Sequence, residues 1–193
     1  MDISVVIPLY NEEESLPELF AWIGRVMKQN NFSYEVIFVD DGSTDCCGDI
    51  IKEYAKHDKR IKLIQQKNAG VSAASNRGID AATGEYVCIH DHDDFVNLDY
   101  FEKMAHAAEI TDADILCGEV NEPGWSFPEF KSVEIATYLA DKINLTHANA
   151  FNCAWRYAYK TEFLNRTKLR FEAAVCGAQD VIFSKSSIVM GLT

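Results

Sequence analysis

The sequence predicts an α/β fold in which helices cover both faces of a mostly parallel β-sheet. Over the first 120 residues, short apolar runs alternate with segments of helical periodicity. Such strict alternation is typical of parallel strands joined by right-handed helical crossovers. Acidic and polar residues gather where three of the apolar runs end. Ligands of parallel sheets bind outside the carboxyl ends of the strands, so these residues are the candidates for a site.

Five apolar runs are the expected strands, and four amphipathic segments are the expected helices between them. The strands are Ile3–Ile7, Glu35–Val39, Ile61–Ile64, Tyr86–Ile89 and Asp114–Cys117. The helices cover residues 16–27, which follow the capping box Ser15-x-x-Glu18, and residues 50–55, 72–82 and 101–108. Beyond Glu119 the alternation stops, and the sequence predicts a strand at Trp155–Tyr159 and a last helix at Asp180–Met190.

Composition limits the class of protein. A chain of 193 residues with 48% hydrophobic and 25% charged residues suits a single globular domain. The formal net charge of −12 argues against nucleic acid as a partner, because phosphate backbones require a basic surface. Every apolar run is shorter than the roughly 18 residues of a membrane-spanning helix. The six cysteines form no CxxC pair, which favours reduced cytoplasmic thiols over a structural zinc site.

The densest group of charged residues follows the strand Tyr86–Ile89, in the segment His90-Asp91-His92-Asp93-Asp94. Asp91 and Asp93 supply two hard oxygen ligands, which suit Mg²⁺ or Mn²⁺ and leave coordination positions for water and phosphate oxygens. The alternative is an acidic turn that caps the next helix, although a cap needs only one carboxylate. The two histidines either bind the metal, which would favour Mn²⁺, or flank the turn without coordinating.

Four motifs occur in series, and together they resemble those of the family 2 glycosyltransferases. The motifs are Val5–Glu12, Val39–Asp45, Asn68–Gly78 and Gly84–Asp94. The resemblance implies a GT-A fold with a Rossmann-like sheet, and inverting transfer of a sugar from a nucleotide diphosphate, with UDP-hexose as the expected donor. It also implies that residues 1–120 bind the nucleotide-sugar. Residues 121–193 would be the acceptor-binding half of the same domain, truncated at the C-terminus.

The resemblance assigns roles to individual residues. It implies nucleotide-sugar contacts for Pro8, Tyr10, Asn11, Glu12, Asp40, Asn76, Arg77, Asp91 and His92, and metal contacts for Asp91 and Asp93. Asp40 would accept a hydrogen bond from the uracil base, and Asp93 would coordinate Mn²⁺ or Mg²⁺ directly. Some of these residues also have a structural interpretation. Asp40 can cap its own Asp-Gly-Ser turn, Pro8 and Tyr10 can simply pack, and Arg77 can lie on a solvated helix face.

The candidate catalytic base is Asp180. Inversion in a single displacement needs one carboxylate to take the proton from the acceptor hydroxyl. The family uses the aspartate of a Glu-Asp pair at the start of a helix, and this chain has Gln179-Asp180 there. The neutral amide removes the like charge that would raise the neighbouring pKa. Asp180 can also be a helix cap, in which case Glu172 is the next candidate.

Two other functions stay open at this stage. The cluster His-Asp-His-Asp-Asp also suits a metal-dependent phosphohydrolase, and Gln179 also allows an inactive nucleotide-binding module. Under the resemblance, the acceptor is a glycan or lipid-linked glycan in surface polysaccharide assembly. The enzyme would then be cytoplasmic, with peripheral association at the inner face of the membrane. The processive signature Gln-x-x-Arg-Trp is absent from the sequence, which favours single-sugar transfer.

Overall fold

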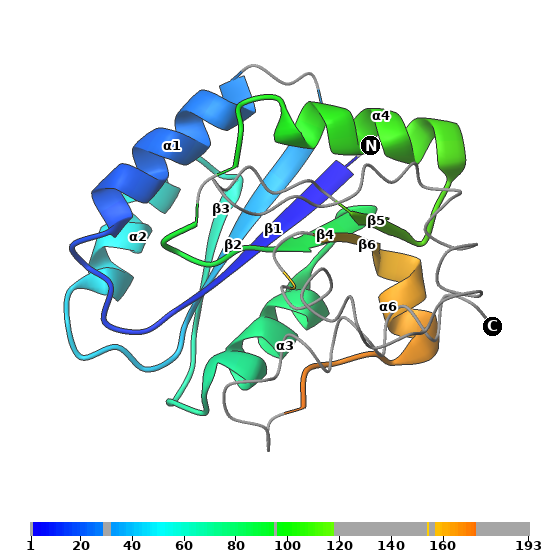
Figure 1. Ribbon diagram of the computed structural model, residues 1–193. Helices are drawn as coiled ribbons and strands as arrows, with labels where there is room; N and C mark the ends of the chain where they lie inside the picture. The colour runs from blue at the N-terminus through cyan, green and yellow to red at the C-terminus, as the bar shows by residue number, and fades with distance from the viewer. Residues whose placement is uncertain (1, 29–31, 95, 118–153, 155–156, 173–193) are drawn as a thin grey trace, which may run out of the picture.

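A computed structural model describes residues 2–28, 32–94, 96–117, 154 and 157–172 (Figure 1). The strands are β1 (Asp2–Leu9), β2 (Ser33–Asp40), β3 (Ile61–Gln65), β4 (Tyr86–Ile89), β5 (Ile115–Cys117) and β6 (Tyr157–Lys160). The helices are α1 (Leu16–Lys28), α2 (Cys47–His57), α3 (Val71–Ala81), α4 (Tyr100–Thr111) and α6 (Thr161–Thr167). No helix of this described part is long and apolar enough to span a membrane.

The six strands form one sheet in the order β3-β2-β1-β4-β6-β5. The first four are parallel, as the alternation predicts, whereas β6 is antiparallel to both β4 and β5. The strand predicted at residues 155–159 is therefore present as β6 and begins at Tyr157. It inserts between β4 and β5, a position that chain order does not reveal.

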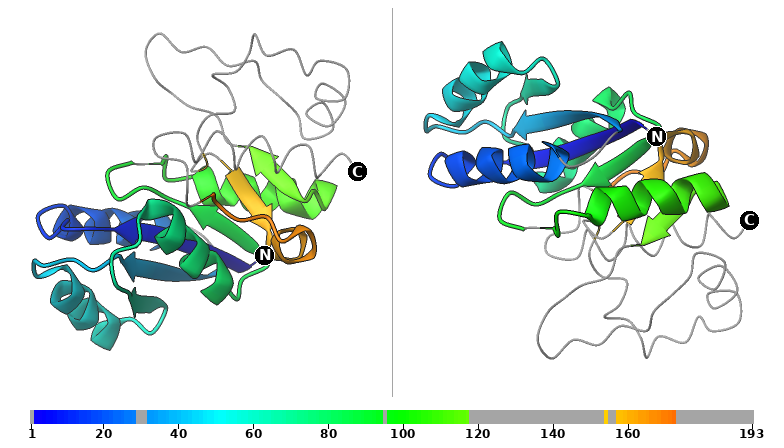
Figure 2. Two further views of the ribbon diagram at one scale, coloured as in Figure 1. Left: turned by 90° about the horizontal axis from the view of Figure 1, so that it is seen from below. Right: turned by 90° about the horizontal axis from the view of Figure 1, so that it is seen from above.

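Helices cover both faces of the sheet, as expected (Figure 2). One hydrophobic cluster joins Val5 and Ile7 of β1 to apolar side chains of α1, α2 and α4. The other joins Val6 of β1 to side chains of α3 and α6. Successive residues of a strand point to opposite faces, so one apolar strand supplies both cores. A Cβ on Gly78 would lie 2.1 Å from the Val6 Cγ1, so this glycine lets α3 approach β1 closely.

Most predicted helix boundaries agree with the structure to within a few residues. At the start of α1, however, the hydroxyl of Ser15 donates to the carbonyl of Glu12 (3.0 Å), a contact that the capping box does not predict. The short helix α6 is also absent from the predicted elements. The predicted helix at residues 180–190 lies outside the described residues.

Strand order brings the polar strand ends together. In register, Leu9 at the end of β1 pairs with Asp40 of β2, and Val6 pairs with Ile89 at the end of β4. β1 lies between β2, its successor in the chain, and β4, which the chain reaches after β3. This reversal of strand order is the kind of switch point at which parallel sheets bind ligands. The predicted convergence of the ends of β1, β2 and β4 is thus confirmed.

Candidate active site

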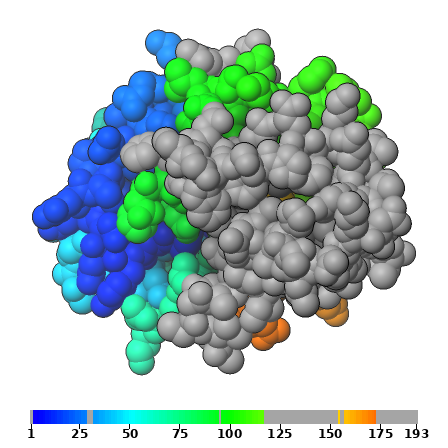
Figure 3. Space-filling view, viewed as in Figure 1, coloured from blue at the N-terminus to red at the C-terminus, as the bar shows by residue number. Residues whose placement is uncertain are grey.

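A cleft opens at the carboxyl ends of β1 and β4. It is lined by Pro8, Leu9, Tyr10, Glu12, Asp41, Val71, Ala74, Asp91, His92 and Asp93. The space-filling view shows the segment after β4, in green, beside the blue N-terminal segment at the surface (Figure 3). Six of these residues are predicted site residues: Pro8, Tyr10, Glu12, Asp91, His92 and Asp93. The structure therefore gathers two parts of the predicted site, the end of β1 and the acidic segment after β4.

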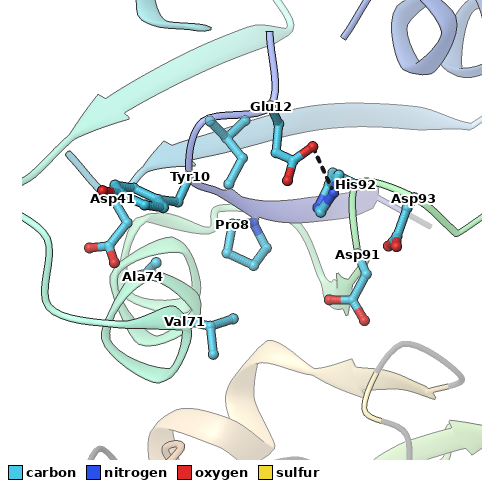
Figure 4. Close-up of a pocket in the computed structure, with 10 residues that line it drawn as sticks. Pro8, Tyr10, Glu12, Asp41, Val71, Ala74, Asp91, His92 and Asp93 are labelled. Atoms are coloured by element: carbon cyan, nitrogen blue, oxygen red, sulfur yellow. Dashed lines mark ion pairs between the residues drawn. The ribbon is translucent and has the colours of Figure 1, made fainter. Parts of the chain in front are cut away.

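The acidic segment presents its side chains in different directions. In the close-up, His92 turns toward Glu12 and Asp91 points the other way (Figure 4). The Nε2 of His92 lies 3.0 Å from Oε2 of Glu12, and both side chains are partly exposed. A carboxylate oxygen can only accept, so Nε2 carries the hydrogen of this contact. His92 is thus engaged with the end of β1.

His90 is a core residue rather than a cleft residue. Its side chain is buried, and its ring stacks on Trp22 of α1 at a centroid distance of 5.0 Å. Its Nε2 lies 2.8 Å from the carbonyl oxygen of Asp94 and must donate to it. Burial lowers the pKa of His90 to about 4, against the raising effect of the Asp94 hydrogen bond. The ring is therefore neutral near pH 7 and fixes the start of the acidic segment.

Asp40 is buried at the end of β2, and its carboxylate is already engaged. Oδ1 accepts from the backbone N–H of Ser43 (2.8 Å), and Oδ2 accepts from the side chain of Gln65 (3.0 Å). Burial raises its pKa, but these hydrogen bonds outweigh that effect and leave the pKa lowered. Asp40 is absent from the cleft lining, so the structure shows the turn-capping contact. The predicted uracil contact remains a prediction.

The neighbouring Asp41 holds the entry to α3. Its carboxylate accepts from the side chain of Gln66 (2.7 Å) and from the backbone N–H groups of Ala69 (2.9 Å) and Gly70 (2.8 Å). Gly70 has a φ of +89°, which is strained for other residues, and space is open around it. Asp41 thereby sets the glycine-containing turn beside the cleft.

Asn11 joins two strand ends instead of facing the cleft lining. Its backbone N–H donates to the hydroxyl of Ser43 (2.9 Å), and its side-chain oxygen accepts from the backbone N–H of Thr44 (2.8 Å). Its φ of 56° lies in the left-handed region, which asparagine tolerates. The residue therefore fixes the β1 end to the segment after β2.

Asn76 and Arg77 lie on α3 outside the cleft lining. The side chain of Asn76 pairs with the backbone of Phe171: Nδ2 donates to the carbonyl (2.9 Å), and Oδ1 accepts from the N–H (2.7 Å). Arg77 is exposed. The structure thus gives Asn76 an anchoring contact with residues just before the predicted base. Asp180 itself lies outside the described residues.

The match to known proteins decides the family. A model of glycosyl transferase family 2 matches residues 4–167. The chain belongs to glycosyltransferase family 2. The uncharacterized glycosyltransferase EpsJ of Bacillus subtilis is 32% identical over 193 residues, which cover 96% of this chain and 55% of the relative. The poly(ribitol-phosphate) beta-glucosyltransferase of Bacillus spizizenii is 29% identical over 97% of this chain and 29% of its own length.

Solved structures agree with this assignment. S. aureus TarS 1-349 in complex with UDP-GlcNAc has a TM-score of 0.75 and 25% identity, over 98% of this chain and 54% of that chain. The predicted GT-A fold and family membership are therefore confirmed. The chain spans about half the length of EpsJ.

For a family 2 member, the donor set at the cleft fits a divalent cation that also binds the nucleotide. Asp91 and Asp93 supply hard carboxylate oxygens to the same cleft. No group of three or more His, Cys, Asp or Glu side chains could hold a metal ion within the described residues. The described residues therefore offer too few ligands there for a closed site, and diphosphate and water oxygens can complete the coordination.

Sequence reasoning missed the contributions of Leu9, Asp41, Val71 and Ala74 to the cleft. Asp41 had an available signal, since it directly follows Asp40 at the strand end. The sequence signal for Val71 and Ala74 was weaker. They start α3 after Gly70, but the face that a helix turns toward a cleft depends on tertiary packing.

Proposed function

We propose that this chain is the nucleotide-sugar-binding part of an inverting hexosyltransferase. It moves a sugar from UDP-hexose to an acceptor hydroxyl. The observation that carries the proposal is the cleft at the switch point, which Pro8 and Tyr10 from the end of β1 line together with Asp91 and Asp93 after β4. An aromatic and apolar wall beside paired carboxylates suits a ligand with a flat base and a metal-bound diphosphate.

Each side of the cleft has a task in this reaction. Tyr10 is 46% exposed, which leaves its ring accessible for stacking on the uracil base. Asp93 would hold Mn²⁺ or Mg²⁺, with Asp91 directed toward the ribose and diphosphate. When bound, the cation supplies positive charge that offsets the charge developing on the leaving diphosphate. Asp40 would complete the base pocket from the end of β2.

The chemical step requires a base for the acceptor. The acceptor oxygen attacks the anomeric carbon as the bond to the diphosphate breaks, and a carboxylate takes the hydroxyl proton. We assign this role to Asp180. Asp180→Asn should bind UDP-sugar normally but transfer at least about 100-fold more slowly. Near-native transfer would leave Asp180 as a helix cap and make Glu172 the next variant to measure.

The acceptor is proposed to be a glycan or lipid-linked glycan of a surface polysaccharide. The similarity to a protein named for transfer to poly(ribitol-phosphate) supports a hydroxyl-rich polymer as the acceptor. Assembly of such polymers from cytoplasmic nucleotide-sugars would place the enzyme in the cytoplasm, at the inner face of the membrane. Pelleting with membranes at low and high salt would test this peripheral association.

One assay separates the proposed function from the two others. The chain is incubated with UDP-sugars and glycan acceptors, with Mn²⁺, with Mg²⁺ or with excess chelator. We expect UDP release that requires acceptor and metal, and a product whose anomeric configuration is inverted by NMR. Phosphate release without sugar transfer would indicate a phosphohydrolase. Binding of UDP without turnover would indicate an inactive nucleotide-binding module.

A further inference from the structure

Glu12 lies between the two halves of the cleft and contacts both. Its backbone N–H donates to the Cys47 Sγ (3.0 Å), which belongs to the first turn of α2 after β2. Its Oε2 lies 3.0 Å from Nε2 of His92, in the segment after β4. In Figure 4 this contact spans the gap from the end of β1 to the acidic segment. One residue therefore connects three strand ends.

The main chain of Glu12 is held firmly on the nucleoside side of the cleft. The next residue, Glu13, donates its N–H to Oδ2 of Asp45 (3.0 Å) and accepts the N–H of Cys46 at Oε2 (2.7 Å). With the Asn11 contacts to Ser43 and Thr44, this row of bonds clamps the segment after β1 to the segment after β2. The Glu12 carboxylate thus extends toward His92 from a main chain that these hydrogen bonds hold in place.

The acidic segment is fastened at both of its ends by α1. At its start, His90 stacks on Trp22 and donates to the carbonyl of Asp94. Just beyond its far end, the indole N–H of Trp22 donates to the carbonyl of Val96 (3.3 Å). Between these points the backbone N–H of Asp94 donates to the carbonyl of Asp91 (3.3 Å), which closes a turn. His92 lies inside this turn, between the two proposed metal-binding aspartates, and its side chain contacts Glu12.

We propose that Glu12 and His92 form a positioning pair that sets Asp91 and Asp93 for the cation and joins the nucleoside and metal halves of the cleft. The proposal rests on the proposed function for its metal, but the pair itself is a structural claim about the protein without ligands. Outer contacts that orient metal ligands typically change metal affinity about 10–100-fold when removed. We therefore expect Glu12 to influence metal binding without contacting the metal.

Two observations favour positioning over direct coordination by these residues. Within the part of the chain that the structure describes, no three His, Cys, Asp or Glu side chains are arranged to hold an ion. In addition, His92 turns toward Glu12 and away from Asp91. Because both partners are partly exposed, the pair stabilises the fold weakly, and variants that lack it should remain folded.

The first test measures amide hydrogen exchange of residues 90–94 in the protein without nucleotide or metal. Glu12→Ala and His92→Ala should each accelerate exchange in this segment, while exchange in β1 and β2 stays unchanged. Glu12→Gln keeps an oxygen that accepts from His92, so it should retain most of the protection. Glu14→Gln is the matched charge control, because Glu14 is exposed on the same segment. Wild-type exchange in Glu12→Ala would overturn the positioning pair.

The second test measures Mn²⁺ affinity by electron paramagnetic resonance in the presence of UDP. We expect about a 10-fold loss in Glu12→Ala, a similar loss in His92→Ala, and no further loss in the double variant. Glu12→Gln and Glu14→Gln should stay within about two-fold of wild type. A larger loss in His92→Ala that adds to that of Glu12→Ala would overturn the proposal in favour of direct ligation by His92.

The two tests separate this inference from the proposed function. Hydrogen exchange needs no substrate, so it reports on the pair even if the chain transfers no sugar. Conversely, a wild-type protein that transfers sugar while Glu12→Ala shows unchanged exchange and unchanged Mn²⁺ affinity would keep the function and reject the pair.

Discussion

At the amino edge of the sheet the Glu35 carboxylate is surrounded by donors, whereas at the carboxyl edge Asp91 and Asp93 line an open cleft. Glu35 lies near the start of β2 and is 8% exposed. It accepts from the Ser4 hydroxyl (2.6 Å) and from the N–H (2.7 Å) and hydroxyl (2.8 Å) of Thr83, and it pairs with Lys62. Its full set of contacts leaves no capacity for a ligand.

The difference shows that burial of charge alone does not mark a functional site in this fold. Burial raises the pKa of Glu35, but the hydrogen bonds from Lys62, Ser4 and Thr83 outweigh it and hold the pKa at about 2. That carboxylate ties together β1, β2, β3 and the turn before β4. At the other edge, Asp91 and Asp93 line a cleft, where we propose that they bind a cation and a diphosphate. One edge uses its carboxylate for stability, and the other edge is expected to use its carboxylates for binding.

The strongest test of this difference between the two edges is to remove a carboxylate from the carboxyl edge. If Asp93 binds the ligand, as we propose, Asp93→Ala should abolish sugar transfer while the melting temperature stays within about 2 °C of wild type. Transfer is measured with UDP-sugar and Mn²⁺, and unfolding by circular dichroism. Asp49→Ala, at an exposed position of α2, is the control. Full transfer by Asp93→Ala, or by wild type in excess chelator, would remove Asp93 from the metal site.

At the amino edge, the same kind of substitution should act on stability instead. Glu35→Ala leaves several buried donors and Lys62 without their acceptor, so we expect a loss of about 3 kcal/mol in the free energy of unfolding. For a chain of this length that corresponds to roughly 6–12 °C in melting temperature. UDP affinity of the folded variant should be unchanged. A variant that unfolds at the wild-type temperature would contradict the structural role.

The low pKa of Glu35 also sets the pH range of its contribution. The carboxyl titrates near 4.5 when unfolded and near 2 when folded, so the unfolded chain binds the proton first. The contribution is fully present above about pH 4.5 and is lost as the pH falls toward 2. The difference in stability between wild type and Glu35→Gln should therefore shrink over that range. A difference that is constant with pH would show that charge is not involved.

The sequence predicted the parts of this comparison that depend on local patterns. Apolar periodicity located β1 to β4 and the helices between them, and the rule for parallel strands placed Asp91 and Asp93 at the same cleft as Tyr10. The insertion of β6 between β4 and β5 depends on tertiary pairing, which periodicity does not encode. The role of His90 was equally hidden. Whether His90 binds a metal or packs in the core depends on its contact with Trp22, which is distant in the sequence.

Asp40 also lies at the carboxyl edge, and it can be either a structural carboxylate or a binding carboxylate. If its carboxylate binds the uracil base, Asp40→Ala should weaken UDP and UDP-sugar binding together, by about 1.5–3 kcal/mol. Gln65→Ala is the matched control, because it removes the internal donor to Oδ2 and leaves the carboxylate in place. We expect this control to keep its UDP affinity. Calorimetry that finds unchanged UDP affinity in Asp40→Ala would make Asp40 a turn cap only.

The smallest expected effect concerns Asn76, whose predicted contact with the nucleotide competes with its contact to Phe171. Two hydrogen bonds to that buried backbone segment are worth about 1–2 kcal/mol together. Arg170 reinforces the same junction, because its guanidinium pairs with Asp80 of α3 at 2.7 Å. We therefore expect Asn76→Ala to lose about 1–2 kcal/mol of stability and to keep its UDP affinity within about two-fold.

Arg77→Ala gives the matched comparison on the same helix, since Arg77 is exposed. It should leave the free energy of unfolding unchanged within about 0.5 kcal/mol. Stability is measured by urea unfolding and UDP affinity by calorimetry on both variants. An Asn76→Ala protein of wild-type stability with weakened UDP binding would reverse the assignment. Such a result would show that α3 also contacts the nucleotide, as the resemblance to the family implies for Asn76.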